Sequence, residues 1–95
     1  MIAVIFRANI KTLDSEYTET ANRMRNLAFE KYGCKDFIAI CEGNQEIAIS
    51  YWPDEASAQA WKNDPEHIQA QQTGQQKWYE SYTVQVTEVR REYQG

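Results

Sequence analysis

The segment Tyr51–His67, YWPDEASAQAWKNDPEH, decides the fold because it joins a strand to two short helices. Apolar and small or polar side chains alternate before Pro53, which predicts a strand. Pro53 ends that strand because proline has no N–H to donate to a sheet. Asp54 predicts the N-cap of a first helix. Asp64-Pro65 predicts the start of a second helix, with the aspartate as N-cap and the proline at the first helical position.

This segment also holds two of the three tryptophans, Trp52 and Trp61, and the only histidine, His67. Large aromatic rings and an imidazole gathered in one short segment are typical of a pocket wall. Each side chain also has a purely structural interpretation. The tryptophans fit the core beneath the helices, and His67, in the first turn of its helix, fits a surface or capping contact. The sequence leaves both interpretations open.

Outside this segment, the spacing of apolar residues predicts the remaining elements. Alternation predicts strands. Apolar residues at 4-4-3-4 spacing predict an amphipathic helix that ends at a left-handed glycine, Gly33; they are Leu13, Tyr17, Ala21, Met24 and Ala28. The predicted elements are a strand Ile2–Ala8, a helix Asp14–Tyr32, strands Phe37–Cys41 and Glu46–Trp52 joined at Gly43-Asn44, and a last strand from Tyr82 that runs as far as Arg91 or Tyr93. The order β-α-β-β-α-β predicts one α+β, ferredoxin-like domain over residues 1–95, a four-stranded antiparallel sheet with helices on one face.

The first strand is apolar on both of its faces. Ile2, Val4 and Phe6 point to one side, and Ala3 and Ile5 point to the other. Because the helices cover one face of the sheet only, the other apolar face needs a second cover. The simplest cover is a second copy of the sheet, so the sequence predicts a homodimer.

Composition excludes several classes of function. The chain of 95 residues carries a net charge of −4 with scattered basic residues, which does not favour a nucleic-acid-binding protein. The longest apolar run, Met1–Phe6, is far shorter than the ~20 residues that span a bilayer. This run also lacks the features of a signal peptide. Cys34 and Cys41 form neither a disulfide framework nor a CxxC motif, so we expect reduced thiols in a cytoplasmic protein.

No metal or organic cofactor is expected either. A single histidine and cysteines without ligand spacing provide no metal site, and the chain has no nucleotide-binding loop.

Three segments besides the first strand carry a family resemblance. They are SYWPDEASAQAW at residues 50–61, NDPEHIQAQQTG at residues 63–74 and YTVQVTEVRREY at residues 82–93. Together they resemble the antibiotic biosynthesis monooxygenase family over essentially the whole chain. The resemblance implies a homodimeric α+β barrel with a pocket between helices and sheet in each subunit. Some members of this family oxidise polyketide phenols without metal or flavin, some oxidise quinols and some degrade heme.

The resemblance implies a cofactor-independent monooxygenase that acts on a small aromatic, phenolic or quinol-type molecule. A phenolate can pass an electron to dioxygen itself, so the protein needs to bind the ring, stabilise its anion and exclude water. Trp52, Trp61 and Trp78 are the candidates to stack on the ring. His67 is the candidate to take the phenolic proton, and Arg7 is the candidate to stabilise the phenolate if it faces the pocket.

Helical spacing adds Gln71 to the substrate-binding candidates. His67, Gln71, Gly74 and Trp78 lie at i, i+4, i+7 and i+11, which predicts one continuous face. Gly74 either ends the helix or leaves room for a ligand. The histidine of the heme-degrading branch falls on Gln71, and its strand asparagine falls near Arg7, so the residues do not favour heme degradation.

A second class of function fits the same fold, namely a non-catalytic small-molecule-binding or stress-response protein. A closed pocket with polar groups from His67 or Arg7 would favour the enzyme. A helix–sheet space filled by Trp61, Trp52 and Met24 would favour the second class. Arg7 also has a structural alternative, as an exposed side chain or as the partner of a glutamate across the sheet.

Overall fold

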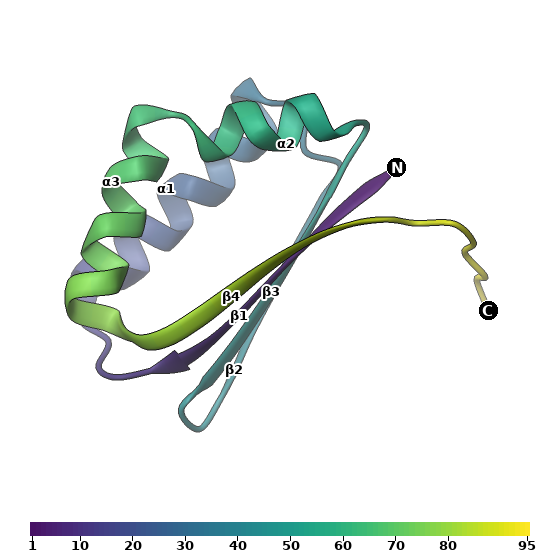
Figure 1. Cartoon of the computed structure of the whole chain (residues 1–95). Helices are drawn as coiled ribbons and strands as arrows, with labels where there is room; N and C mark the ends of the chain where they lie inside the picture. The colour runs from purple at the N-terminus through teal and green to yellow at the C-terminus, as the bar shows by residue number, and fades with distance from the viewer.

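The element order that the sequence predicts is present in the computed structural model, which describes all residues 1–95 (Figure 1). The elements are β1 (Ile2–Ile10), α1 (Ser15–Lys31), β2 (Asp36–Glu42), β3 (Gln45–Trp52), α2 (Glu55–Lys62), α3 (Pro65–Thr73), a π-helical turn η1 (Gly74–Trp78) and β4 (Tyr79–Glu88). None of the helices is long and apolar enough to cross a membrane.

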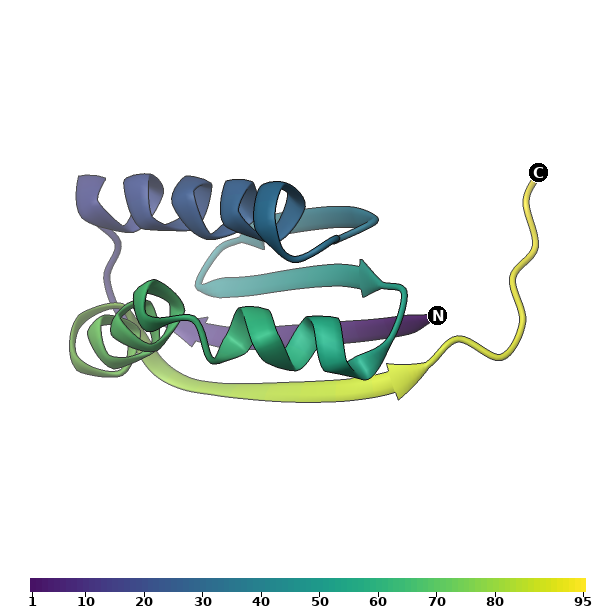
Figure 2. The ribbon, with the colours of Figure 1, turned by 90° about the horizontal axis from the view of Figure 1, so that it is seen from above.

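The four strands form one antiparallel sheet in the order β2-β3-β1-β4. All three helices lie on one face of it (Figure 1). Seen from above, α1 runs along the β2–β3 side, and α2 and α3 run along the β1–β4 side (Figure 2). The fold is therefore the predicted ferredoxin-like α+β arrangement, in which the second face of the sheet carries no helix.

Local signals set the ends of the helices where the sequence places them. The Asp14 side chain accepts a hydrogen bond from the Tyr17 N–H at the start of α1, and Asp54 accepts one from the Ser57 N–H at the start of α2. Gly33 follows α1 with φ 76°, a left-handed conformation that glycine adopts without steric cost. These caps are local hydrogen bonds, which explains why the sequence predicts them well.

The last strand and the first helix differ from expectation in detail. β4 begins at Tyr79 rather than Tyr82 and ends at Glu88, and the following residues leave the sheet as an extended tail (Figure 1). On α1, the predicted apolar stripe is only partly buried, since Leu13 precedes the helix and Ala21 is exposed. The residues that α1 buries follow the tighter i, i+3, i+4 pattern: Met24, Leu27 and Ala28.

The core centres on Trp52, whose ring is fully buried at the end of β3. It packs with Ala28 of α1 and Ala58 of α2, two small residues that let both helices approach the sheet closely. The Trp52 Nε1–H donates to the Ser50 hydroxyl at 2.8 Å, so the only polar atom of the buried ring is satisfied. Trp61 of α2 covers this cluster, with a distance of 5.2 Å between the two indole centroids.

Strand register fixes which side chains face the helices. Ile2 pairs with Trp52 and Glu88, and Phe6 pairs with Val84, so the even-numbered residues of β1, β3 and β4 lie on the helix-facing side. The opposite side of the sheet, here called the outer face, carries the odd-numbered residues of these strands, except Tyr79, which lies beyond a register shift and faces the helices. The first strand therefore has apolar side chains on both faces, with Ile2, Val4 and Phe6 toward the helices and Ala3 and Ile5 on the outer face.

Gly74 lies at a close approach between the π-helical turn and the first residue of β4. Its backbone is right-handed helical, with φ −59° and ψ −45°, so alanine fits the conformation. A Cβ atom at this position, however, would lie 2.9 Å from two ring carbons of Tyr79. Gly74 is therefore required for the packing of the Tyr79 ring rather than for its own backbone angles.

We expect Gly74→Ala to lower the free energy of unfolding by about 1–3 kcal/mol, the usual cost of overpacking. Helix propensity alone predicts the opposite sign, a gain of about 1 kcal/mol. Urea unfolding measures the difference. In a Tyr79→Ala background, where the ring is gone, the same change should be neutral or stabilising. Equal effects of Gly74→Ala in both backgrounds would show that the Tyr79 ring is not what excludes a side chain at this position.

Candidate functional site

Three of the predicted site residues come together beneath α2 and α3. The imidazole of His67 stands edge-on to the indole of Trp61, with 4.2 Å between ring centroids. Gln71, one helical turn further along α3, lies 2.8 Å from His67 Nδ1 through its Nε2 atom. The Trp61 Nε1–H donates to the Met24 carbonyl oxygen at 3.0 Å, which fixes the indole between α1 and α2.

Asp64 sets the angle between α2 and α3 that brings His67 onto Trp61. Its buried carboxylate accepts the Glu66 N–H at 2.9 Å and the Tyr32 hydroxyl at 2.6 Å. Lys31 adds an ion pair at 3.7 Å. The Tyr32 hydrogen bond holds the pKa of Asp64 below its usual value. The helix α3 therefore begins at a turn that is bonded to the C-terminal end of α1. The sequence alone could not predict the direction in which α3 leaves this turn.

Burial controls the chemistry of His67. It lowers the imidazole pKa from 6.5 to about 4, so His67 is neutral at pH 7. The Gln71 Nε2 group donates one hydrogen to the Lys62 carbonyl oxygen at 3.3 Å. Because an amide nitrogen can only donate, the same group donates its other hydrogen to His67 Nδ1, which is the acceptor. The ring proton is then on Nε2. In this tautomer His67 presents an N–H donor, and action as a general base requires Gln71 to release Nδ1.

The other three predicted site residues do not contact His67 or Gln71. Trp52 packs beneath Trp61 and is enclosed in the core. Trp78 is buried at the far end of the sheet, where its Nε1–H donates to Asp14 at 3.1 Å and its ring meets Tyr17 edge-on. The predicted continuous face from His67 to Trp78 is interrupted because the chain passes through a π-helical turn, in which the Tyr79 N–H bonds the Gly74 carbonyl.

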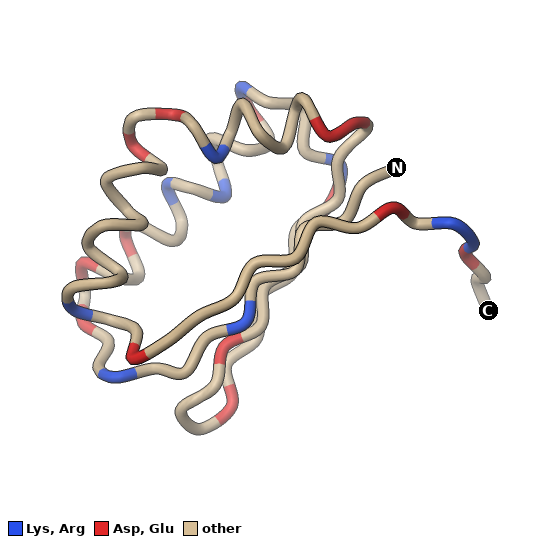
Figure 3. Tube along the Cα trace, viewed as in Figure 1, with Lys and Arg blue, Asp and Glu red and all other residues tan.

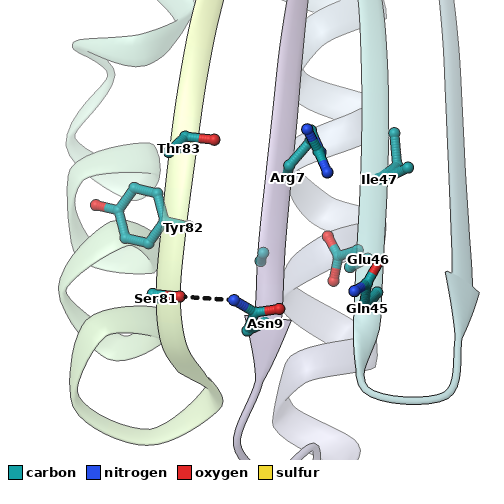
Figure 4. Close-up of a pocket in the computed structure, with 9 residues that line it drawn as sticks. Arg7, Asn9, Gln45, Glu46, Ile47, Ser81, Tyr82 and Thr83 are labelled. Atoms are coloured by element: carbon teal, nitrogen blue, oxygen red, sulfur yellow. Dashed lines mark hydrogen bonds between the residues drawn. The ribbon is translucent and has the colours of Figure 1, made fainter.

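Arg7 is exposed on the outer face of the sheet, away from His67. In register it lies between Thr83 of β4 and Ile47 of β3, and no carboxylate lies within ion-pair distance (Figure 4). It borders a shallow hollow in which Asn9 donates to the Ser81 hydroxyl at 2.9 Å. The condition for an Arg7 role beside His67, that it face the helices, is not met within one subunit.

A cluster that the sequence analysis missed surrounds Glu46. This side chain is only 6% exposed and lies on the helix-facing side of β3. The Tyr17 hydroxyl donates a hydrogen bond to Glu46 Oε1, and the Tyr79 hydroxyl lies 3.3 Å and 3.5 Å from the two carboxylate oxygens. Burial, together with the glutamate charge, raises the pKa of both tyrosines.

Strand alternation contained the signal for this cluster. Glu46 is in phase with Ser50 and Trp52, so a strand that buries Trp52 also turns Glu46 toward the helices. A glutamate at such a position needs hydrogen-bond partners, and the partners come from distant parts of the chain. Only the position of Glu46, and not the identity of its partners, could have been read from the sequence.

The helix-facing side of β4 is incompletely covered. Val84 and Val86 point to the side that carries the helices, yet they are 46% and 52% exposed. α3 buries none of its residues. Phe6, Val84 and Val86 thus form a partly exposed apolar strip, here called the β4 strip, on the side of the sheet over which α2 and α3 lie (Figure 2).

Comparison with known proteins establishes the fold class. The chain superposes on a Nitrosomonas europaea protein assigned as an antibiotic biosynthesis monooxygenase, with a TM-score of 0.78, 15% identity and coverage of 96% of this chain and 100% of the other. It superposes on SnoaB, a cofactor-independent oxygenase from Streptomyces nogalater, with a TM-score of 0.79, 12% identity and coverage of 96% and 94%. The protein therefore has the antibiotic biosynthesis monooxygenase fold, as the sequence predicts.

A sequence relative defines the family more narrowly. No protein-family model matches the chain. The chain is 36% identical over 91 residues to YqjZ of Bacillus subtilis strain 168, an uncharacterised protein, and the match covers 95% of this chain and 80% of YqjZ. The protein belongs to the same family as YqjZ.

The lowered pKa of His67 predicts a pH-dependent stability. Between pH 6.5 and about 4 the unfolded chain binds a proton that the folded chain does not, so the free energy of unfolding falls as the pH falls through this range. The loss attributable to His67 approaches about 3 kcal/mol, at 1.36 kcal/mol per pKa unit. Urea unfolding of wild type and His67→Gln from pH 7 to pH 4 measures it, because the carboxylates titrate in both proteins. Parallel curves for the two proteins would contradict burial of a neutral imidazole.

Proposed function

We propose that the protein is a cofactor-independent monooxygenase for a small aromatic, phenolic or quinol-type molecule that binds against the β4 strip. The observation that carries this proposal is the exposed apolar strip on the helix-facing side of the sheet, the side over which α2 and α3, with Trp61 and His67, lie (Figure 2). Small-molecule sites are mostly apolar, with a few well-placed polar groups. The shared fold with an oxygenase supports the same reaction class.

In this reaction the protein needs to bind the substrate and stabilise its negative charge. A phenol plus dioxygen gives a quinone plus water, in which one oxygen atom enters the ring and the other leaves as water. The first step is transfer of an electron from the phenolate to dioxygen, so the protein must favour the phenolate. The His67 Nε2–H is suited to donate a hydrogen bond to the phenolate oxygen, and Phe6 with the two valines is suited to hold the ring.

One observation favours the non-catalytic alternative. Trp52 is fully buried and Trp61 is fixed by its bond to Met24, so these indoles fill the helix–sheet space at one end of the sheet. A protein that binds a small molecule along the remaining strip without oxidising it would use the same surfaces. Oxygen uptake, rather than binding, separates the two functions.

The enzyme hypothesis predicts oxygen consumption with a panel of hydroquinones and naphthols. His67→Ala should lower turnover by about 10²–10³, the usual cost of removing one hydrogen-bond donor that stabilises an oxyanion. Val84→Trp should abolish turnover by filling the strip, and Asn22→Trp, on the exposed side of α1, is its control. Binding of the panel without oxygen uptake would support the alternative, and full activity of Val84→Trp would place the reaction elsewhere.

We further propose that the protein acts as a homodimer through the outer face of the sheet. This face exposes three isoleucines on neighbouring strands, Ile38 at 50%, Ile40 at 60% and Ile47 at 42%. A flat apolar patch of this kind is typical of an interface with another protein. A second copy of the chain would cover it, would bury the hollow around Arg7, and would give the two-sheet packing that the first strand predicts.

Light scattering tests the dimer. Wild type should have twice the chain mass of 11.1 kDa at micromolar concentration, with a buried interface above about 1,200 Å². Ile40→Glu combined with Ile47→Glu should give monomers, because like charges and carboxylates without partners would face each other across the interface. Val86→Glu, on the helix-facing side, is the control and should stay dimeric. A monomeric wild type would contradict the proposal.

A further inference from the structure

The Glu46 cluster has a chemical consequence for the β4 strip, because it lies in the next row of the same sheet face. In register, Glu46 of β3, Ala8 of β1 and Tyr82 of β4 form one row across the helix-facing side. The adjacent row contains Phe6 and Val84 of the strip. Glu46 and Phe6 are therefore diagonal neighbours on adjacent strands, and such neighbours lie about 7–8 Å apart, a distance that an aromatic side chain can span.

Tyr79 provides that link. Its ring meets the Phe6 ring edge-on at 5.2 Å and lies 6.0 Å from the Tyr82 ring. Its hydroxyl reaches Glu46, and the ring is held from behind by the close approach of Gly74. Tyr79 is half-buried. The side chain is therefore fixed in place, with its ring against Phe6 of the strip and its hydroxyl at a buried carboxylate.

The carboxylate determines how the Tyr79 hydroxyl can interact. No lysine, arginine or histidine lies within ion-pair distance of Glu46, so phenolic O–H groups are its partners. A carboxylate can only accept hydrogen bonds, and each tyrosine hydroxyl has one hydrogen to give. Burial raises the pKa of Tyr79, which keeps that hydrogen in place at neutral pH. With its hydrogen committed to Glu46, the Tyr79 oxygen is left with acceptor capacity only.

We infer that Tyr79, oriented by Glu46, accepts a hydrogen bond from a ligand hydroxyl at the β4 strip and so selects hydroxyl-bearing aromatics over otherwise similar molecules that lack a donor. Tyr79 is the binding residue and Glu46 is a positioning residue that acts through it. The other polar group of the proposed site, the His67 N–H, is a donor. The pair favours a ring that offers a hydroxyl donor on one side and an oxygen acceptor on the other, as the singly ionised form of a hydroquinone does.

This inference rests on the proposed binding at the β4 strip, and it makes no use of turnover. The probes are 1-naphthol, which has a hydroxyl donor, and 1-methoxynaphthalene, which has only an acceptor oxygen. Isothermal titration calorimetry gives both dissociation constants. The quantity of interest is their ratio in each variant, since the different apolar areas of the two probes contribute equally to every protein.

Wild type should prefer 1-naphthol about tenfold more than Tyr79→Phe does, the equivalent of one hydrogen bond. Glu46→Gln should reduce or reverse the preference, because the amide can donate to the Tyr79 oxygen and turn its hydrogen toward the ligand. Tyr93→Phe is the control, because it removes a tyrosine hydroxyl from the tail, where Tyr93 is 81% exposed and its hydroxyl is bonded to Arg91. It should keep the wild-type ratio.

The possible results separate the two proposals. If Val84→Trp blocks both probes while Glu46→Gln and Tyr79→Phe keep the wild-type ratio, the β4 strip binds aromatics and the selection by Tyr79 is wrong. If wild type binds neither probe, or Val84→Trp leaves binding unchanged, the proposed site is wrong and this inference falls with it. Circular dichroism establishes that each variant is folded before its ratio is compared.

Discussion

Burial of the Trp52 ring is the contact on which the rest of the structure depends. Trp52 is the last residue of β3, and its ring packs against Ala28 of α1 and Ala58 of α2, which joins the sheet to both helices. Removing so large a buried side chain from a small domain would cost about 3–5 kcal/mol, a large part of the 5–15 kcal/mol that stabilises a typical domain. The position of α2 against the sheet is therefore tied to one residue at the strand end.

The candidate site follows from this anchor in successive contacts. Trp61 packs on Trp52, and His67 packs on Trp61, so the imidazole occupies a place that the core defines. Asp64 adds direction, because its bonds to Tyr32 and to the first turn of α3 fix the angle of the chain. Burial then withdraws the imidazole from water and lowers its pKa, which converts a residue of ordinary basicity into a neutral hydrogen-bonding group.

Charge on the molecule is distributed in keeping with this arrangement. Lysines, arginines and carboxylates lie mainly on the helices, the connections and the tail, and the middle of the sheet is almost free of them (Figure 3). Arg7 and Glu46 are the exceptions, and they lie on opposite faces. The carboxylate is enclosed by tyrosines on the helix-facing side, and the guanidinium is exposed on the outer face, so the two sides of the sheet differ in polarity as well as in cover.

The sequence determined the elements and their order, because the signals involved are local. Asp14, Asp54 and Asp64 cap helices through bonds to residues two or three positions away, and Gly33 and Gly43 take positive φ angles that other residues avoid. Strand alternation also predicted correctly that the first strand is apolar on both faces. Such patterns need no knowledge of distant parts of the chain.

Only the tertiary structure decided which side of each strand meets the helices, and with it the make-up of the site. Alternation grouped Arg7 with Ala3 and Ile5 but could not say that the helices cover the other face. Helical periodicity placed Trp78 with His67, and the π-helical turn before β4 separated them. The partners of Glu46 lie 29 and 33 residues away from it in the chain. Contacts between residues so far apart in the chain form only when tertiary packing brings them together, so no local sequence pattern predicts them.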